Sequence, residues 1–228
     1  MNGFFVTGTD TEIGKTEVSS ALLIGLADAG FQTVAMKPVA SGCVNTKEGL
    51  RNSDAMQLQD SASRKAAYCL VNPYAFEPPI APHLAAEISG VTIDSGPILD
   101  AFYQLSKGDH YTVVEGVGGW LVPLNQDYTV ENLAQDLLLP VIIVVGLRLG
   151  CLNHALLTER AILSSGCKVV GWIGNHMSPE FTMSNENIRT LEREMKSPKL
   201  GVFPFLESVN SKVLAQHLNI ELLTAYGK

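Results

Sequence analysis

Near the N-terminus a glycine-rich turn carries a lysine and a hydroxyl residue at a spacing suited to binding phosphate. The segment Gly8-Thr9-Asp10-Thr11-Glu12-Ile13-Gly14-Lys15-Thr16 follows a predicted strand and opens a predicted helix. In that setting backbone N–H groups and the helix dipole surround phosphate oxygens, the ammonium meets the β- and γ-phosphates, and the hydroxyl ligates Mg²⁺. Five residues separate the two glycines, one more than in the common pattern, so a glycine-rich turn with an incidental Lys-Thr pair is the alternative. The context favours a phosphate-binding loop (P-loop).

Two carboxylates are placed to share a metal ion with the Thr16 hydroxyl. Glu115 ends a predicted strand and precedes Gly116-Val117-Gly118-Gly119, so it lies at the carboxyl edge of the predicted sheet, where open α/β proteins bind ligands. Asp54 begins a predicted helix, where position alone favours a first-turn acid that interacts with the helix dipole. Because Mg²⁺ prefers a few oxygen ligands together with waters and phosphates, Thr16, Asp54 and Glu115 form a chemically sensible set.

A second lysine, Lys37, ends the second predicted strand and is followed by Pro38, Ser41 and Gly42. A lysine at a strand end is most often a solvated charge, since lysine is rarely buried unless it is paired. On the sheet edge that carries the P-loop, however, its ammonium would neutralise charge on a transferring phosphoryl group or on a carbamate.

These residues must be positioned by a scaffold in which short β-branched runs alternate with longer helical stretches. That alternation predicts a single three-layer α/β domain over residues 1–228, with a mostly parallel central sheet and helices on both faces. The predicted strands are Phe4–Thr7, Thr33–Met36, Tyr111–Glu115, Val141–Val145, Val169–Ile173 and Leu200–Phe203. The predicted helices are Lys15–Ala29, Ser53–Gln59, Pro82–Ser89, Ile98–Ser106, Val130–Leu138, Asn153–Ser165 and Met183–Met195, with Gly30, Gly108 and Gly166 at C-caps. The Asn-, Ser- and Pro-rich segment Pro38–Pro82 is predicted to be a long functional loop.

Composition and charge exclude several classes of protein. Hydrophobic residues make up 46% of the 228 residues and charged residues 17%, which argues against a disordered chain or a coiled coil. The net charge of -7 opposes broad binding to nucleic acid or to an anionic membrane. The longest apolar run, Leu137–Leu147, is about half the roughly 20 residues that a membrane span needs. We therefore expect a globular protein that binds small molecules.

Four scattered cysteines and the N-terminal segment indicate the compartment. Cys43, Cys69, Cys151 and Cys167 form no C-x-x-C pair and have no histidine at zinc-ligand spacing, so reduced thiols in a cytosol fit best. Met1–Gly8 lacks the basic patch and longer apolar stretch of a signal peptide. The expected location is cytoplasmic.

Five separated segments, in order along most of the chain, resemble the dethiobiotin synthase family. They are Thr7–Thr16, Lys37–Gly42 (Lys-Pro-Val-Ala-Ser-Gly), Gly49–Ala55 (Gly-Leu-Arg-Asn-Ser-Asp-Ala), Glu115–Trp120 (Glu-Gly-Val-Gly-Gly-Trp) and Leu149–His154 (Leu-Gly-Cys-Leu-Asn-His). Val71-Asn72-Pro73-Tyr74, and Gly171-Trp172 with Asn175, also match. The P-loop alone is shared by many families, whereas the other segments together are specific.

The resemblance implies an ATP-dependent, Mg²⁺-dependent ring-closing carbon–nitrogen ligase of biotin synthesis, with a P-loop NTPase-like fold. Such an enzyme converts 7,8-diaminononanoate, CO2 and ATP into dethiobiotin, ADP and phosphate. The implied path runs through a carbamate and a carbamic-phosphoric anhydride. The implied partners are these small molecules and a second copy of the chain in a homodimer, with no nucleic acid and no membrane.

The resemblance also implies roles for residues in the matching segments. Lys15 and Lys37 would flank the carbamate and the γ-phosphate, Thr11 and Ser41 would bind near the reacting amine or carbamate, and Thr16, Asp54 and Glu115 would hold Mg²⁺. The remaining nucleotide contacts would come from Glu12, Ile13, Gly14, Glu17, Gly116, Val117, Gly118, Asn175, His176, Pro204, Phe205 and Leu206, the last five around adenine. The turn of Leu149, Gly150, Cys151, Leu152 and Asn153, which opens a helix, would bind the substrate carboxylate across the dimer interface.

Several residues have plainer roles or depart from the family pattern. Without the resemblance, Asn175 could simply cap a turn, and Cys151 is more often a small packed hydrophobe than a nucleophile. Asn187 stands where a tyrosine would contact the substrate carboxylate, and Ser211 where an acid would reach the nucleotide, a role that Glu207 could take instead.

Two other functions share this fold. A P-loop ATPase switch that positions DNA or division proteins usually has a second lysine early in the loop, where this chain has Asp10 and Thr11. The synthetase domain of a cofactor amidotransferase needs a glutaminase module, for which the sequence has no spare length. If the protein is a ligase, phosphate release should depend strictly on the diamine. Neither alternative function predicts this dependence.

Overall fold

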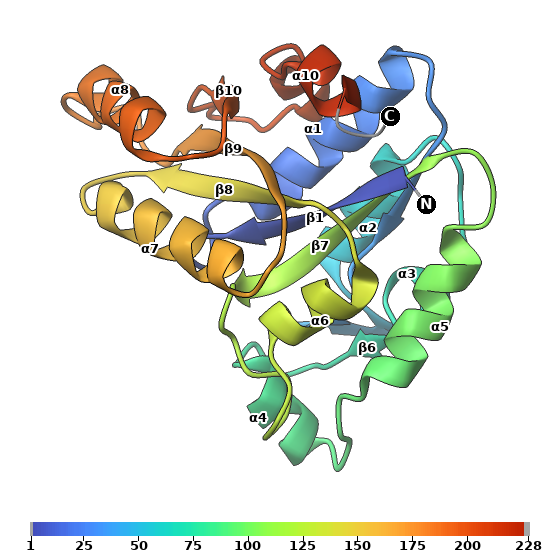
Figure 1. Cartoon of the computed structure of the whole chain (residues 1–228). Coiled ribbons are helices and arrows are strands. Elements are labelled where there is room, and N and C mark those ends of the chain that lie inside the picture. The colour runs from blue at the N-terminus through green and yellow to red at the C-terminus, as the bar shows by residue number, and fades with distance from the viewer. Residues whose placement is uncertain (1, 226–228) are drawn as a thin grey trace.

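A six-stranded sheet with the order β10-β9-β8-β1-β7-β2 forms the centre of the protein (Figure 1), as seen in a computed structural model that describes residues 2–225. Every strand pair in this sheet is parallel. The carboxyl ends of its strands therefore meet at one edge, and the P-loop follows β1 in the interior of the sheet. The strands are β1 (Asn2–Gly8), β2 (Thr33–Met36), β7 (Tyr111–Gly119), β8 (Val141–Leu147), β9 (Val169–His176) and β10 (Lys199–Phe203).

Helices cover both faces of the sheet. Since successive residues of a strand point to opposite faces, neighbouring residues of the central strands pack into two different cores. Phe4 and Ile142 pack in one core with residues of α1, whereas Phe5 and Ile143 pack in the other with residues of α5, α6 and α7. The three-layer prediction is confirmed. The helices are α1 (Lys15–Asp28), α2 (Ser53–Ser61), α3 (Tyr68–Val71), α4 (Pro82–Ile88), α5 (Ser95–Leu105), α6 (Val130–Leu137), α7 (Cys151–Ser164), α8 (Ser184–Glu194), α9 (Ser211–Ala215) and α10 (Ile220–Ala225).

The segment predicted as a long loop contains regular structure of its own. Residues Val39–Ala40 (β3) pair in parallel with Tyr74–Ala75 (β6), and Val44–Thr46 (β4) forms an antiparallel hairpin with Gly49–Arg51 (β5). The short helix α3 lies between α2 and β6 in the sequence, and α9 and α10 were likewise not predicted. Strands of two or three residues are too short to show a periodic pattern, so the sequence gives no signal for them.

Some predicted boundaries are wrong. Strand β7 does not end at Glu115 but continues to Gly119, because Gly119 still pairs with Gly8 after an irregularity in the β1–β7 register. Helix α5 begins at Ser95, and α7 begins at Cys151. Gly108 lies two residues beyond the Ser106 cap of α5, whereas Gly30 and Gly166 directly follow their helix caps as predicted.

Within residues 2–225, none of the helices combines the length and the apolar character that crossing a lipid bilayer requires.

Candidate active site

A cavity of about 740 Å³ opens at the carboxyl edge of the sheet, between the P-loop, the segment after β2 and the end of β7. Most of the predicted catalytic and metal-binding residues lie around it, although they come from distant parts of the sequence. The predicted site residues that line it are Thr11, Glu12, Gly14, Lys15, Thr16, Glu17, Lys37, Ser41, Asp54, Glu115, Val117 and Gly118. The lining that was not predicted consists of Ala40, Asn52, Pro79, Ile80, Ala81, Pro82 and Val122.

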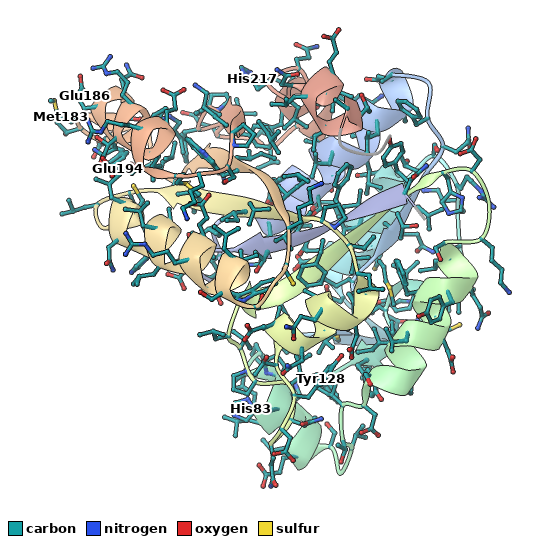
Figure 2. All side chains as sticks on the ribbon, viewed as in Figure 1. His83, Tyr128, Met183, Glu186, Glu194 and His217 are labelled. Carbon is teal, nitrogen blue, oxygen red and sulfur yellow. The ribbon has the colours of Figure 1, made fainter. Side chains whose placement is uncertain are left out.

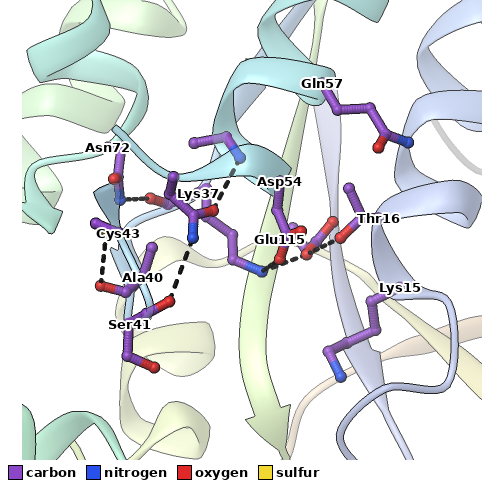
Figure 3. Close-up of polar contacts among 12 residues, drawn as sticks. Lys15, Thr16, Lys37, Ala40, Ser41, Cys43, Asp54, Gln57, Asn72 and Glu115 are labelled. Atoms are coloured by element: carbon purple, nitrogen blue, oxygen red, sulfur yellow. Dashed lines mark hydrogen bonds and ion pairs between the residues drawn. The ribbon is translucent and has the colours of Figure 1, made fainter. Parts of the chain in front are cut away.

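One buried carboxylate joins the P-loop to the second lysine. The Thr16 hydroxyl donates to Glu115 Oε1 at 3.0 Å, and Lys37 Nζ donates to the same oxygen (Figure 3). Lys37 Nζ also lies 3.3 Å from Asp54 Oδ2. The structure therefore brings Thr16, Lys37, Asp54 and Glu115 into direct contact.

The charges of this cluster depend on one another. Glu115 is 1% exposed and Lys37 is 5% exposed. Burial acts to lower the pKa of Lys37, but the charges of Glu115 and Asp54 outweigh burial and raise that pKa above its usual value. Lys37 is therefore a fixed positive charge, not a proton donor or acceptor at neutral pH. The second oxygen of Glu115, Oε2, is buried and has no hydrogen-bond partner among residues 2–225.

The P-loop adopts a conformation that brings its backbone around the cavity. Glu12 (φ 56°) and Gly14 (φ 84°) are left-handed, and a Cβ at Gly14 would lie 2.2 Å from Asn175 Nδ2, so the position requires glycine. Lys15 Nζ donates to the Asp10 carbonyl at 2.7 Å. Burial, and secondly the charge of Lys37, lower the pKa of Lys15 to about 8. Two lysines thus concentrate positive charge where phosphate oxygens would enter.

The predicted adenine contacts form a separate group beside the P-loop. Asn175 Nδ2 donates to the Ile13 carbonyl at 3.0 Å, so this side chain holds the P-loop backbone in the structure. His176 Nε2 lies 3.3 Å from the Ser184 hydroxyl, and burial lowers the pKa of this histidine. Pro204, Phe205 and Leu206 directly follow Phe203, the strand partner of Asn175.

Two residues of the nucleotide set are held differently from the rest. The Ile13 side chain is buried in the core around α1, and a Cβ on Gly116 would lie 3.1 Å from the Phe5 ring. Both residues therefore have only backbone groups to offer to a ligand.

The predicted carboxylate-binding turn lies outside the cavity lining. Gly150 (φ 94°) caps the N-terminus of α7 without a side-chain hydrogen bond, and Leu149 is 94% exposed. Cys151 is buried, and burial raises the pKa of its thiol. Arg148, just before the turn, forms an ion pair with Asp10 of the P-loop. This ion pair connects the turn to the P-loop.

The two residues that depart from the family pattern, Asn187 and Ser211, each lie in a helix. The Asn187 amide donates to the Met183 carbonyl of its own helix at 2.9 Å. Ser211 is the first residue of α9, whose N-terminus is capped by the Asn210 side chain, and Glu207 is exposed.

Sequence reasoning missed three polar residues that border the site. Asn52 caps α2, and an asparagine directly before a predicted helix is a recognisable signal for this role. Tyr68 and Asn72 bond to one another and to the backbone near Lys37. Asn72 lies in a segment that matches the family, but only the tertiary structure shows what it and Tyr68 contact.

Comparison with known proteins assigns the family. Residues 2–213 match the model of a family described as AAA domain. The ATP-dependent dethiobiotin synthetase BioD of Pseudomonas paraeruginosa (strain DSM 24068 / PA7) is 47% identical over 224 residues, which cover 98% of each chain. This chain belongs to the dethiobiotin synthetase family. The dethiobiotin synthetase of Xanthomonas oryzae pv. oryzae (strain PXO99A) is 46% identical over 217 residues, or 95% of this chain and 97% of the relative.

Two solved structures share the fold of this dethiobiotin synthetase family member at much lower identity. The septum site-determining protein MinD of Pyrococcus horikoshii OT3 has a TM-score of 0.60 and 13% identity, and covers 100% of this chain and 96% of its own. A ParA family ATPase from Chlorobium tepidum TLS has a TM-score of 0.55 and 15% identity, and covers 99% and 90%. The predictions of a P-loop NTPase-like fold and of an ATP-dependent ligase of biotin biosynthesis are confirmed, and the ligase is favoured over the switch and the amidotransferase domain.

Proposed function

We propose that this chain closes the cyclic urea of dethiobiotin at the cavity described above. An amine of 7,8-diaminononanoate adds to CO2 and loses a proton to give a carbamate, whose oxygen takes the γ-phosphoryl group of ATP and releases ADP. The second amine then attacks the carbamate carbon, the bond from that carbon to the phosphate oxygen breaks, and phosphate leaves with a proton. The observation that carries this proposal is the contact of Lys37 and Thr16 with one buried oxygen of Glu115 beside the P-loop.

The two lysines supply the positive charge that phosphoryl transfer requires. The loop backbone and the N-terminus of α1 would receive the phosphates, with Lys15 on the β- and γ-phosphates. Lys37, directly after β2, would approach the carbamate and the γ-phosphate. Thr11 and Ser41 line the same cavity, and their hydroxyls would contact the amine or the carbamate. Because carboxylates hold Lys37 charged, its role is to stabilise developing negative charge and not to transfer a proton.

The oxygens around Glu115 fit a magnesium ion. Mg²⁺ is usually bound by one or two carboxylates together with substrate phosphates, and Asp54 and Glu115 are two carboxylates that line the cavity beside the P-loop. Thr16, Asp54 and Glu115 would hold it, and the unpartnered Glu115 Oε2 is a free ligand atom. When bound, Mg²⁺ neutralises charge on the β- and γ-phosphates.

The rest of the nucleotide and the substrate tail would be bound farther from the cluster. Asn175, His176 and residues 204–206 would contact adenine. Asn175 bonds to the P-loop backbone, and residues 204–206 directly follow Phe203, its strand partner. The Leu149–Asn153 turn would bind the substrate carboxylate at the N-terminus of α7, in the site of a second copy of the chain. This homodimer is supported by the exposure of Leu149 and by the position of the turn outside its own cavity lining. The four cysteines are free, which suits a reducing cytoplasm.

The test is to incubate the protein with Mg-ATP, bicarbonate and 7,8-diaminononanoate and to detect the cyclic urea by mass spectrometry. We expect phosphate release to require both the diamine and Mg²⁺. Phosphate released at the same rate without the diamine would favour the ATPase switch. Specific activity that stays constant on dilution to concentrations where light scattering detects only monomers would contradict the shared site.

A further inference from the structure

Three polar side chains that take no part in the proposed reaction lie beside the site, between the Lys37 segment, the start of α2 and the short helix α3; of the three, Asn52 lines the cavity. They are Asn52, Tyr68 and Asn72; Asn52 is 5% exposed and Asn72 is 3% exposed. A buried amide is costly unless its donors and acceptors are paired. The bonds that satisfy these amides therefore decide how the surrounding backbone is held.

Asn72 holds the backbone of the second lysine. Its Nδ2 donates to the Lys37 carbonyl at 2.7 Å (Figure 3). It also donates to the Tyr74 carbonyl at 3.1 Å. The backbone N–H of Lys37 donates to the Val71 carbonyl at 2.7 Å. The peptide groups on both sides of Lys37 are thus bonded to one short segment, which fixes the origin of the side chain that reaches Glu115.

Asn52 holds the other two cavity residues of this region. Its Oδ1 accepts from the N–H of Ala55 at 3.1 Å and so caps α2, the helix whose first turn carries Asp54. Its Nδ2 donates to the Ser41 carbonyl at 3.3 Å. One amide therefore sets the position of Asp54 relative to Ser41.

The Tyr68 hydroxyl links the backbone of Asn52 to the side chain of Asn72. It accepts from the backbone N–H of Asn52 at 2.8 Å and donates to Asn72 Oδ1 at 3.1 Å. The guanidinium of Arg51 lies over the Tyr68 ring, 4.3 Å from its centroid, which keeps the ring in place.

We propose that Tyr68 is a positioning residue of the active site, whose hydroxyl acts through Asn52 and Asn72 to hold Lys37, Ser41 and Asp54 in one arrangement. The inference rests on the proposed function, because it concerns the geometry of that same reaction. It explains why the segments around Asn52 and Asn72 accompany the phosphate-binding and lysine segments, although neither asparagine is assigned to substrate or nucleotide. Misplacement of reacting groups by about 1 Å costs on the order of 100-fold in rate.

The test is Tyr68→Phe, which removes the hydroxyl and keeps the ring beneath Arg51. We expect kcat to fall about tenfold, while the KM for ATP stays within about twofold, since the P-loop is untouched. In a Lys37→Ala background the same substitution should change kcat much less, because the group that Tyr68 positions is missing. A purely structural role would lower the melting temperature without this dependence on Lys37.

The matched control is Tyr128→Phe. Tyr128, labelled in Figure 2, shortly precedes α6 in the chain. Its hydroxyl donates to Asp136 Oδ2 of α6 at 2.6 Å, and α6 carries no residue proposed for the reaction. We expect this variant to lose stability without losing kcat.

If Tyr68→Phe does not fold, a second variant tests the proposal. Asn52→Ser retains a capping oxygen for α2 but cannot reach the Ser41 carbonyl, and we expect it to lower kcat as well. If Tyr68→Phe keeps the wild-type kcat, or if it does not fold and Asn52→Ser keeps the wild-type kcat, while the wild type makes the cyclic urea, the positioning role is wrong and the proposed function stands. A wild type that makes no cyclic urea overturns the proposed function and this inference together.

Discussion

Two helices of this protein begin in the same way but lie in opposite surroundings. Helices α1 and α7 each have 14 residues, each starts after a left-handed glycine, and neither N-terminus has a side-chain cap. At Gly14 a Cβ would lie 2.2 Å from Asn175 Nδ2, whereas at Gly150 it would meet nothing within 4 Å. Both helix ends favour an anion, but only the end of α1 is enclosed by side chains of its own chain.

The difference separates a site that one chain completes from a surface that needs something else. Around the start of α1 the chain supplies two lysines, three hydroxyl residues and four carboxylates within one cavity. Around the start of α7 it supplies Leu149, which is almost fully exposed, and an ion pair on the surface between Arg148 and Asp10. The first end therefore suits the proposed phosphoryl chemistry, and the second suits the carboxylate that we propose binds across a homodimer interface.

The largest expected effect is at the enclosed end. Lys37→Ala should lower kcat by about 10²–10³-fold, because it removes a preorganised positive charge from the reacting groups. Equilibrium binding of ATP, measured by calorimetry, should persist, since Lys15 and the loop backbone remain. Near-normal turnover would exclude Lys37 from the active site.

Gly14→Ala should weaken ATP binding about tenfold or more, because a left-handed alanine costs about 1–2 kcal/mol and its methyl group displaces Asn175. The measurement is the Kd of ATP by calorimetry. Unchanged affinity would mean that the P-loop of this chain does not hold the nucleotide in the way proposed. Gly30→Ala, at a left-handed position with open space at the C-terminus of α1, is the matched control and should affect stability only.

Gly150→Ala should have a smaller and different effect. Its strain costs about 1 kcal/mol of stability, and we expect the KM for the diamine to rise about fivefold because the helix end binds the substrate carboxylate less well. The KM for ATP should not change. If the KM values for diamine and ATP rise together, the two helix ends do not have separate ligands.

The smallest effect concerns the thiol at the exposed end. A helix N-terminus usually lowers the pKa of a cysteine, but burial raises the pKa of Cys151, and also that of Cys43. Both thiols stay protonated at neutral pH, so a thiol reagent should modify the exposed Cys69 first, as read by mass spectrometry of peptides. Cys69→Ser should abolish the fast labelling. Rapid labelling of Cys151 would show that the start of α7 is more open than in this structure.

The cluster of Thr16, Lys37, Asp54 and Glu115 was predictable because its members follow apolar runs or lie in the first turn of a helix. Lys37 and Glu115 follow apolar runs whose strands had to be parallel neighbours, and parallel strands bring their carboxyl ends together. The P-loop was readable from its own residues, since its glycines and lysine are consecutive with the strand and helix that they connect. The contact of Lys37 with Glu115 needed the structure, because a sequence places two residues at one edge without setting which atoms meet.

The sequence by itself determined the layered fold, the phosphate-binding loop and the residues that gather at its edge, because hydrophobic periodicity and strand-end chemistry are local properties. Only the tertiary structure decided that Tyr68 bonds to Asn52 and Asn72, and that the turn at Gly150 lies outside the cavity lining. Hydrogen bonds between side chains require that atoms from segments far apart in the chain be placed to within a few tenths of an ångström. Those distances are set by the packing of the whole protein, and no short segment contains them.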